Sequence, residues 1–131
     1  MNDGGLLLRG AKLKDIVSLG VCVNIYQTCN GVQFKSMPAS DFVCSLNLKL
    51  PKDKVCSLPG EKQRICYMIY LVAQTIVPAD MARHWIKEIL ELSSISYEYY
   101  DKHHKDAVGI NASKNNKEFR KIINEAMKRA Y

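Results

Sequence analysis

Several familiar signatures of chemistry are absent from this sequence of 131 residues. It contains no C-x-x-C pair and no H-E-x-x-H pattern, and its cysteines are irregularly spaced, so neither a zinc finger nor a zinc ribbon is expected. Glycine-rich phosphate loops of the G-x-x-x-x-G-K or G-x-G-x-x-G type do not occur either. We therefore expect neither a bound metal ion nor a cofactor.

Targeting and membrane-spanning segments are also missing. The longest apolar run, residues 65–77, is shorter than the roughly 18–20 residues that a helix needs to cross a bilayer. The first residues lack the basic start and long apolar stretch of a signal peptide. Internal repeats and low-complexity tracts are absent as well. The sequence thus favours a cytoplasmic globular protein that does not contact a membrane.

Cysteines are few and odd in number. They are Cys22, Cys29, Cys44, Cys56 and Cys66. Without a secretion signal we expect reduced and mostly buried thiols. No local signature of a nucleophile surrounds any of them, and the three histidines do not form part of a recognisable catalytic pattern. No catalytic residue is therefore predicted, and the sequence favours a non-enzymatic protein.

The chain does contain enough apolar material for one domain. Hydrophobic residues make up 47% of the sequence and charged residues 24%, which is typical of a folded globular protein. We expect residues 1–10 to form a flexible leader and residues 11–131 to form a single globular helical domain.

Residues 65–77 are the segment around which the fold is expected to be organised. Only Gln74 and Thr75 in it are plainly polar, and a helix that is apolar on nearly every face is a buried helix. Pro78 marks its end. The sequence therefore predicts a helix over about 60–77 at the centre of a mainly α, compact, single-domain bundle of four or five helices.

The N-terminal half is open to two interpretations. Residues 11–29 carry apolar side chains at helical spacing, and Asn30-Gly31 would then end a helix. The same pair is also a hairpin signal, with residues 32–35 as the return strand. We favour the helix there. Residues 38–50 pose the same choice: Pro38, Ser40 and Asp41 resemble a helix start, but the alternation of apolar and polar residues fits a strand better. The alternative fold is α+β with a small N-terminal β-hairpin or meander.

The C-terminal half has a clear helical pattern. Apolar residues predict a helix over about 79–104, with the serine-rich segment 93–96 as its weakest part. Ser113 is expected to cap a last helix over about 114–130. The apolar residues of that helix fall within an arc of roughly 140°, with lysines on the opposite side.

Nearly all of the net positive charge lies in the last thirty residues. The whole chain has a formal net charge of +6, and residues 102–131 contain eight basic and three acidic residues, which gives +5. Lysines on one face of a helix can neutralise phosphates without reading sequence. The residues expected to contact nucleic acid are Lys114, Lys117, Arg120, Lys121 and Lys128, with Asn116, Arg120 and Asn124 as candidates for reading bases.

A group of tyrosines provides the other candidate surface. Tyr97, Tyr99 and Tyr100 are close in sequence, and tyrosine is enriched in the hot spots of protein interfaces. On a helix, Tyr97 and Tyr100 share a face while Tyr99 points elsewhere. We expect a small binding or regulatory module that contacts a protein partner, or a second copy of itself, through these tyrosines. The alternative function is a nucleic-acid-binding regulator that uses the basic C-terminal helix.

Overall fold

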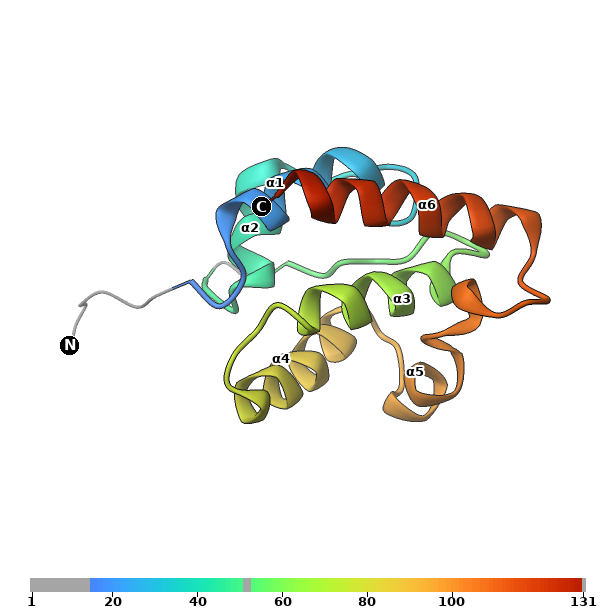
Figure 1. Cartoon of the computed structure of the whole chain (residues 1–131). Helices are drawn as coiled ribbons and strands as arrows, with labels where there is room; N and C mark the ends of the chain where they lie inside the picture. Colours follow the sequence, from blue (N-terminus) through green and yellow to red (C-terminus); the bar gives the residue numbers. More distant parts are fainter. Residues whose placement is uncertain (1–14, 51–52, 131) are drawn as a thin grey trace.

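Six α-helices and one short 3-10 helix form the part of the chain that the structure, a computed structural model, describes: residues 15–50 and 53–130 (Figure 1). The elements are α1 (Leu19–Cys29), α2 (Ala39–Leu46), α3 (Lys62–Ala73), α4 (Ala79–Leu92), α5 (Tyr97–His103), the 3-10 helix η1 (Asp106–Val108) and α6 (Lys114–Arg129). Within these residues no β-strand forms, so the helical bundle is confirmed and the α+β alternative is wrong. The predicted leader lies outside the described residues.

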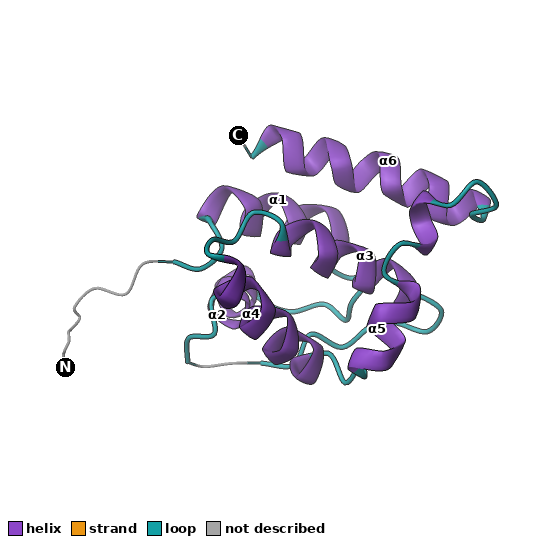
Figure 2. Ribbon diagram, turned by 60° about the horizontal axis from the view of Figure 1, so that its bottom comes forward, coloured by secondary structure: helices purple, strands orange, loops and turns teal. Residues whose placement is uncertain are grey.

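Helix α3 lies at the centre of the bundle, as the sequence predicts. Figures 1 and 2 show it with α6 on one side and α4 and α5 on the other. Ile65 and Ile69 are fully buried. The helix ends earlier than expected, at Ala73, where Thr75 Oγ donates a hydrogen bond to the Val72 carbonyl and competes with a further turn. None of the helices in the described ranges has the length and apolar content to span a membrane.

The strand predicted within residues 38–50 is wrong. Ala39–Leu46 forms α2, which buries Phe42 and Leu46 on one face, as a helix does with residues four apart. Trp85 of α4 donates its indole N–H to the Leu46 carbonyl at 2.6 Å. This contact with a distant helix satisfies a carbonyl that would otherwise lack a partner at the helix end.

The Asn30-Gly31 pair ends α1 and does not open a hairpin. Gly31 has φ +76°, which is the left-handed conformation that commonly follows a helix. The next residues form a turn, and Phe34 makes an isolated bridge to Ser57. The helical interpretation of this segment is therefore confirmed for Leu19–Cys29, whereas residues 15–18 are not helical and residues 11–14 lie outside the described residues.

The single helix predicted over 79–104 is divided in two. Helix α4 ends at Leu92, and Ser94 adopts φ +55° in the connection. Ser96 then caps α5, and its Oγ accepts a hydrogen bond from Tyr99 N at 3.1 Å. The serine-rich segment identified as the weak part is the break. This division helps to explain why the bundle has six helices in place of four or five.

Helix α1 holds the C-terminal half of α6. Asn24 Nδ2 donates a hydrogen bond to the Ala126 carbonyl at 3.0 Å. One turn away, Gly20 lies against Ala130, and a Cβ added at Gly20 would be 3.4 Å from the Ala130 carbonyl oxygen. The two helices therefore pack closely, and Figures 1 and 2 show α6 extending beside α1 along one edge of the bundle.

Candidate nucleic-acid interface

Helix α6 presents its lysines on one exposed face. Lys114, Lys117, Lys121 and Lys128 are all exposed, and we call these four residues the lysine stripe. At about 100° per residue they fall within an arc of about 60°, and at about 1.5 Å of rise per residue they extend over about 21 Å. The last helix is thus confirmed with its predicted polar face, and the stripe is narrow, with the exposed Glu125 at its flank between Lys121 and Lys128.

The apolar face of α6 differs in detail from the predicted arc. Ser113 caps the helix as expected, since its Oγ accepts a hydrogen bond from Asn116 N at 3.1 Å. Phe119 and Ile123 are buried in the core. Ile122, however, is 54% exposed, whereas Asn116 is only 5% exposed. A polar residue therefore takes part in the packing of α6 on α3.

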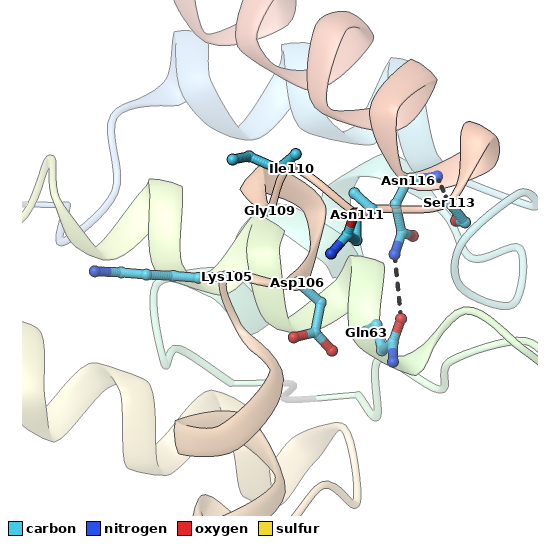
Figure 3. Close-up of a pocket in the computed structure, with 9 residues that line it drawn as sticks. Gln63, Lys105, Asp106, Gly109, Ile110, Asn111, Ser113 and Asn116 are labelled. Atoms are coloured by element: carbon cyan, nitrogen blue, oxygen red, sulfur yellow. Dashed lines mark hydrogen bonds between the residues drawn. The ribbon is translucent and has the colours of Figure 1, made fainter.

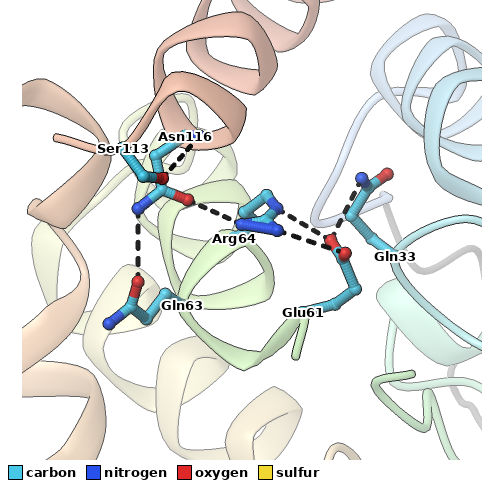
Figure 4. A network of polar contacts seen from close by, with 6 residues as sticks. All are labelled: Gln33, Glu61, Gln63, Arg64, Ser113 and Asn116. Atoms are coloured by element: carbon cyan, nitrogen blue, oxygen red, sulfur yellow. Dashed lines mark hydrogen bonds and ion pairs between the residues drawn. The ribbon is translucent and has the colours of Figure 1, made fainter. Parts of the chain in front are cut away.

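A network of polar side chains fixes the N-terminal end of α6 on α3 (Figure 4). Arg64 is at its centre: Nε donates to Glu61 Oε1 at 2.9 Å and Nη1 donates to Asn116 Oδ1 at 2.8 Å. Asn116 Nδ2 donates to Gln63 Oε1 at 3.2 Å, and Gln33 Nε2 donates to Glu61 Oε1 at 3.3 Å. Because these largely buried groups are paired with one another, the network sets one position of α6 against α3.

The asparagines predicted to read bases are engaged inside the fold. Asn116 belongs to the network, and Asn124 Nδ2 donates to the Tyr67 hydroxyl at 3.0 Å and to the Arg120 carbonyl at 2.7 Å. Arg120 is half-buried. The stripe is therefore built of lysines alone, and Arg120 lies at its inner flank.

The charge of the described chain is unevenly distributed. Residues 15–50 and 53–101 contain seven basic and nine acidic residues, which gives −2, against +5 for residues 102–131. Among described residues, the only ion pair of the stripe joins Lys128 to Glu125 at 3.9 Å, and both side chains are exposed. An exposed ion pair of this kind contributes little stabilising free energy. The positive field is therefore strongest along α6.

The three tyrosines of α5 lie in three different environments. Tyr97 is 54% exposed, Tyr99 is half-buried and Tyr100 is 5% exposed. The Tyr100 ring stacks on His104 with centroids 4.7 Å apart, and burial raises the pKa of the Tyr100 phenol. Lys62 Nζ lies 5.1 Å from the centre of the Tyr99 ring. The three tyrosines therefore do not form one exposed surface.

The two histidines at the end of α5 are held by their Nδ1 atoms. His103 Nδ1 lies 2.6 Å from Asp106 Oδ2, and His104 Nδ1 lies 2.8 Å from the Tyr100 carbonyl oxygen. Both contacts require the proton on Nδ1, because a carboxylate and a carbonyl only accept. No three His, Cys, Asp or Glu side chains of residues 15–50 and 53–130 are grouped so as to hold a metal ion.

Most of the cysteine thiols are withdrawn from solvent. Cys22, Cys29 and Cys66 are buried, Cys44 is half-buried and Cys56 is exposed. Burial raises the pKa of Cys22 to about 11 and the pKa values of Cys29 and Cys66 to about 12. These three thiols are protonated at neutral pH and are poor nucleophiles.

A cavity with both polar and apolar lining, beside the N-terminal end of α6, was not predicted. It has a volume of about 490 Å³, and we call it the α6 pocket (Figure 3). Its polar lining comes from Gln63, Lys105, Asp106, Asn111, Ser113 and Asn116. The network joins Gln63 of α3 to Asn116 of α6, and the segment between η1 and α6 supplies the rest of the lining.

Comparisons of this chain with protein-family models, with curated proteins and with solved structures find no significant match. The fold and the site together define a small helical domain with one basic face and a pocket at the end of that face.

Proposed function

We propose that this protein binds the phosphate backbone of a nucleic acid through the lysine stripe. The observation that supports the proposal is the placement of four exposed lysines within one narrow arc of α6. Lysines that approach phosphates release condensed counterions, which favours binding without any reading of sequence. The rest of the described chain, residues 15–50 and 53–101, has a net charge of −2 and is therefore less attractive to an anionic ligand.

Both ends of the stripe are anchored, which favours a binding surface over a merely solvated helix face. Arg64 and Asn116 hold its beginning, and Asn24 holds the backbone of α6 near its end. A length of about 21 Å spans several phosphates, since each strand of a duplex carries one phosphate per roughly 3.4 Å of axis. A preorganised surface of this kind loses little conformational entropy on binding.

The test is a fluorescence titration with a labelled single-stranded RNA and a labelled DNA duplex, at about 50 and 200 mM salt. We expect affinity to fall steeply with salt. In the double variant Lys117→Gln/Lys121→Gln, two phosphate contacts are lost, so the slope of log K against log salt should decrease by about 1.4 for the single strand.

The matched control is Arg83→Gln/Lys87→Gln, which makes the same change in charge on α4, across α3 from α6 (Figure 1). This control should retain the wild-type slope. An equal decrease of the salt slope in the two double variants would show that binding responds to net charge alone. It would contradict a defined phosphate contact at the stripe.

A second candidate function is supported by Tyr97, the most exposed of the α5 tyrosines. It lines a groove of about 350 Å³ between α4 and α5, together with Lys87, Glu88, Leu90, Glu91 and Ile95. An exposed tyrosine beside an apolar and acidic groove suits a protein partner. If folded wild-type protein binds neither nucleic acid at low salt, the phosphate proposal is wrong and this protein-binding alternative takes its place.

A further inference from the structure

The α6 pocket lies where the lysine stripe begins. Ser113 and Asn116 line it, and Lys114 of the stripe lies between them in sequence. One helix therefore supplies both the wall of the pocket and the first lysines. Its volume of about 490 Å³ lies within the usual range for small-ligand sites, about 300–1,000 Å³.

Two of the lining residues take part in hydrogen bonds that build the wall. Asn116 Oδ1 accepts from Arg64, and Asn116 Nδ2 donates to Gln63 Oε1. Ser113 Oγ accepts from the Asn116 backbone N–H. These groups shape the pocket, and the network holds them in place whether or not a ligand is present.

Three other polar groups around the pocket are left without a partner. Among the described residues, no hydrogen bond uses Gln63 Nε2, the side-chain amide of Asn111 or Asp106 Oδ1. Figure 3 shows these three side chains around the same space. The pocket therefore offers two amide donors beside a carboxylate acceptor.

The carboxylate of Asp106 is held in place from outside the pocket. His103 Nδ1 contacts Oδ2 at 2.6 Å and uses one of the lone-pair positions of the carboxylate. A carboxylate has about four such positions on its two oxygens. Both oxygens of Asp106 can therefore still accept a hydrogen bond, and the His103 contact orients them.

We propose that the α6 pocket binds an unpaired guanine base of a single-stranded nucleic acid. This inference rests on the proposed function, because the stripe would hold the phosphates on either side of that base. The Watson–Crick edge of guanine has two adjacent N–H donors, which match the Asp106 carboxylate. Its O6 atom is an acceptor, which matches an amide donor of Gln63 or Asn111.

The other bases match this set of groups less well. Adenine has one donor beside an acceptor on the same edge, so it leaves part of the carboxylate unpaired. Uracil has one donor between two acceptors. In a duplex the Watson–Crick edge of guanine is already paired, so only single strands, loops and ends can supply the base.

An exposed apolar side chain at the pocket is consistent with a base as the ligand. Ile110 is 92% exposed and belongs to the lining, and Figure 3 shows it beside Gly109 at the edge of the pocket. An apolar side chain in this position gains contact area when the face of a base covers it. Ile110 thus provides a stacking surface, while the polar groups contact the edge of the base.

The test measures a preference as a ratio of affinities. A uridine RNA of about ten nucleotides, a length within the usual site sizes for single strands, carries one central guanosine, inosine or adenosine. We expect the guanosine RNA to bind about tenfold more tightly than the adenosine RNA. Inosine, which lacks the N2 amino group, should fall between them.

Two variants locate the preference in the α6 pocket. Asp106→Asn keeps an oxygen acceptor for His103 but removes one acceptor for guanine, and Asn111→Ala removes an amide from an exposed loop position. Both variants should lower the ratio of guanosine-RNA to adenosine-RNA affinity toward one, and both should keep the same salt slope as the wild-type protein. The control Asn115→Ala makes the same Asn-to-Ala change on α6 outside this pocket, facing the groove that contains Gln33 and Ile122, and should keep the ratio.

The outcomes separate this inference from the proposed function. Equal binding of the three RNAs with a steep salt slope would refute the guanine pocket and leave the lysine stripe supported. Loss of preference in Asn115→Ala as well would place recognition outside the pocket. The variant Lys117→Gln/Lys121→Gln should weaken all three RNAs alike and keep the ratio. Absence of binding to any RNA at low salt would refute the guanine pocket, and absence of binding to the DNA duplex as well would refute the lysine stripe.

Discussion

The tyrosines of α5 and the lysine stripe of α6 are each a set of residues of one type on a single helix in the C-terminal half of the chain. The two sets lie in different environments. Tyr100 is 5% exposed and packs on His104, while Tyr97 is 54% exposed. All four lysines of the stripe are exposed. Neighbouring residues of one type are thus divided between core and surface on α5, whereas residues of one type share a single environment on α6.

The difference comes from the cost of burying each side chain. An unpaired ammonium group is expensive to remove from water, so lysine at an unpartnered helix face stays exposed wherever the helix packs. Tyrosine has a large apolar ring and one polar atom, and it is stable in the core or at the surface. The position of a tyrosine is therefore decided by the neighbouring helices, and the position of a lysine by its own charge.

The largest expected effect comes from truncating the buried tyrosine. Tyr100→Ala removes a ring that packs between α5 and its neighbours, and large aromatic residues truncated in a core typically cost about 3 kcal/mol or more. Tyr97→Ala should change the free energy of unfolding by about 1 kcal/mol or less. Urea denaturation of both variants measures the difference. Equal losses would show that the two rings are equivalent and would remove the contrast within α5.

A smaller effect for each group is expected at alkaline pH. Burial raises the pKa of the Tyr100 phenol above its usual value near 10, so above that pH the unfolded chain releases a proton that the folded chain retains. The free energy of unfolding should therefore fall as pH rises, by up to about 1.4 kcal/mol per pH unit for each such group. Cys22, Cys29 and Cys66 act in the same direction from about pH 9.

Tyr100→Phe isolates the contribution of the phenol. The variant keeps the ring and removes the ionisable group, so its stability should decline less between pH 9 and 11 than that of wild type. Below pH 9 the difference between the two proteins should be constant. Parallel declines over the whole range would mean that the phenol of Tyr100 is not the group that titrates.

The smallest effect on stability is expected at the lysine stripe. Lys117→Gln/Lys121→Gln changes two exposed side chains, and surface substitutions of this kind usually alter the free energy of unfolding by less than about 0.5 kcal/mol. Thermal or urea unfolding checks this. A substantial loss of stability would indicate that these lysines take part in packing, and it would weaken the interpretation of any change in nucleic-acid binding.

Much of the fold was predictable from local patterns. The apolar segment 65–77 predicted a buried central helix, and Ser113 predicted the start of the last helix. The strand predicted within 38–50 was wrong: the segment forms α2, which buries Phe42 and Leu46 on one face, and Trp85 of α4 donates a hydrogen bond to the Leu46 carbonyl. That contact joins residues distant in the chain, so alternation within the segment gave no indication of it.

The candidate site was predictable only in part. The lysines of α6 were identified from their spacing, and their exposure agrees with that pattern. Asn116 was expected at the surface but is buried, because Arg64 and Gln63 of α3 supply its hydrogen-bond partners. The α6 pocket depends on the same contacts between segments. No local pattern of spacing encodes them.

The sequence by itself determined which segments are helical around an apolar centre and where the positive charge lies, because helical periodicity and the cost of burying lysine act locally. Only the tertiary structure decided which tyrosine is buried and which amides pair. It also decided that Gln63, Asp106 and Asn111 surround one cavity. Those outcomes depend on the packing of α3, α5 and α6, and therefore on hydrogen bonds between residues far apart in the chain.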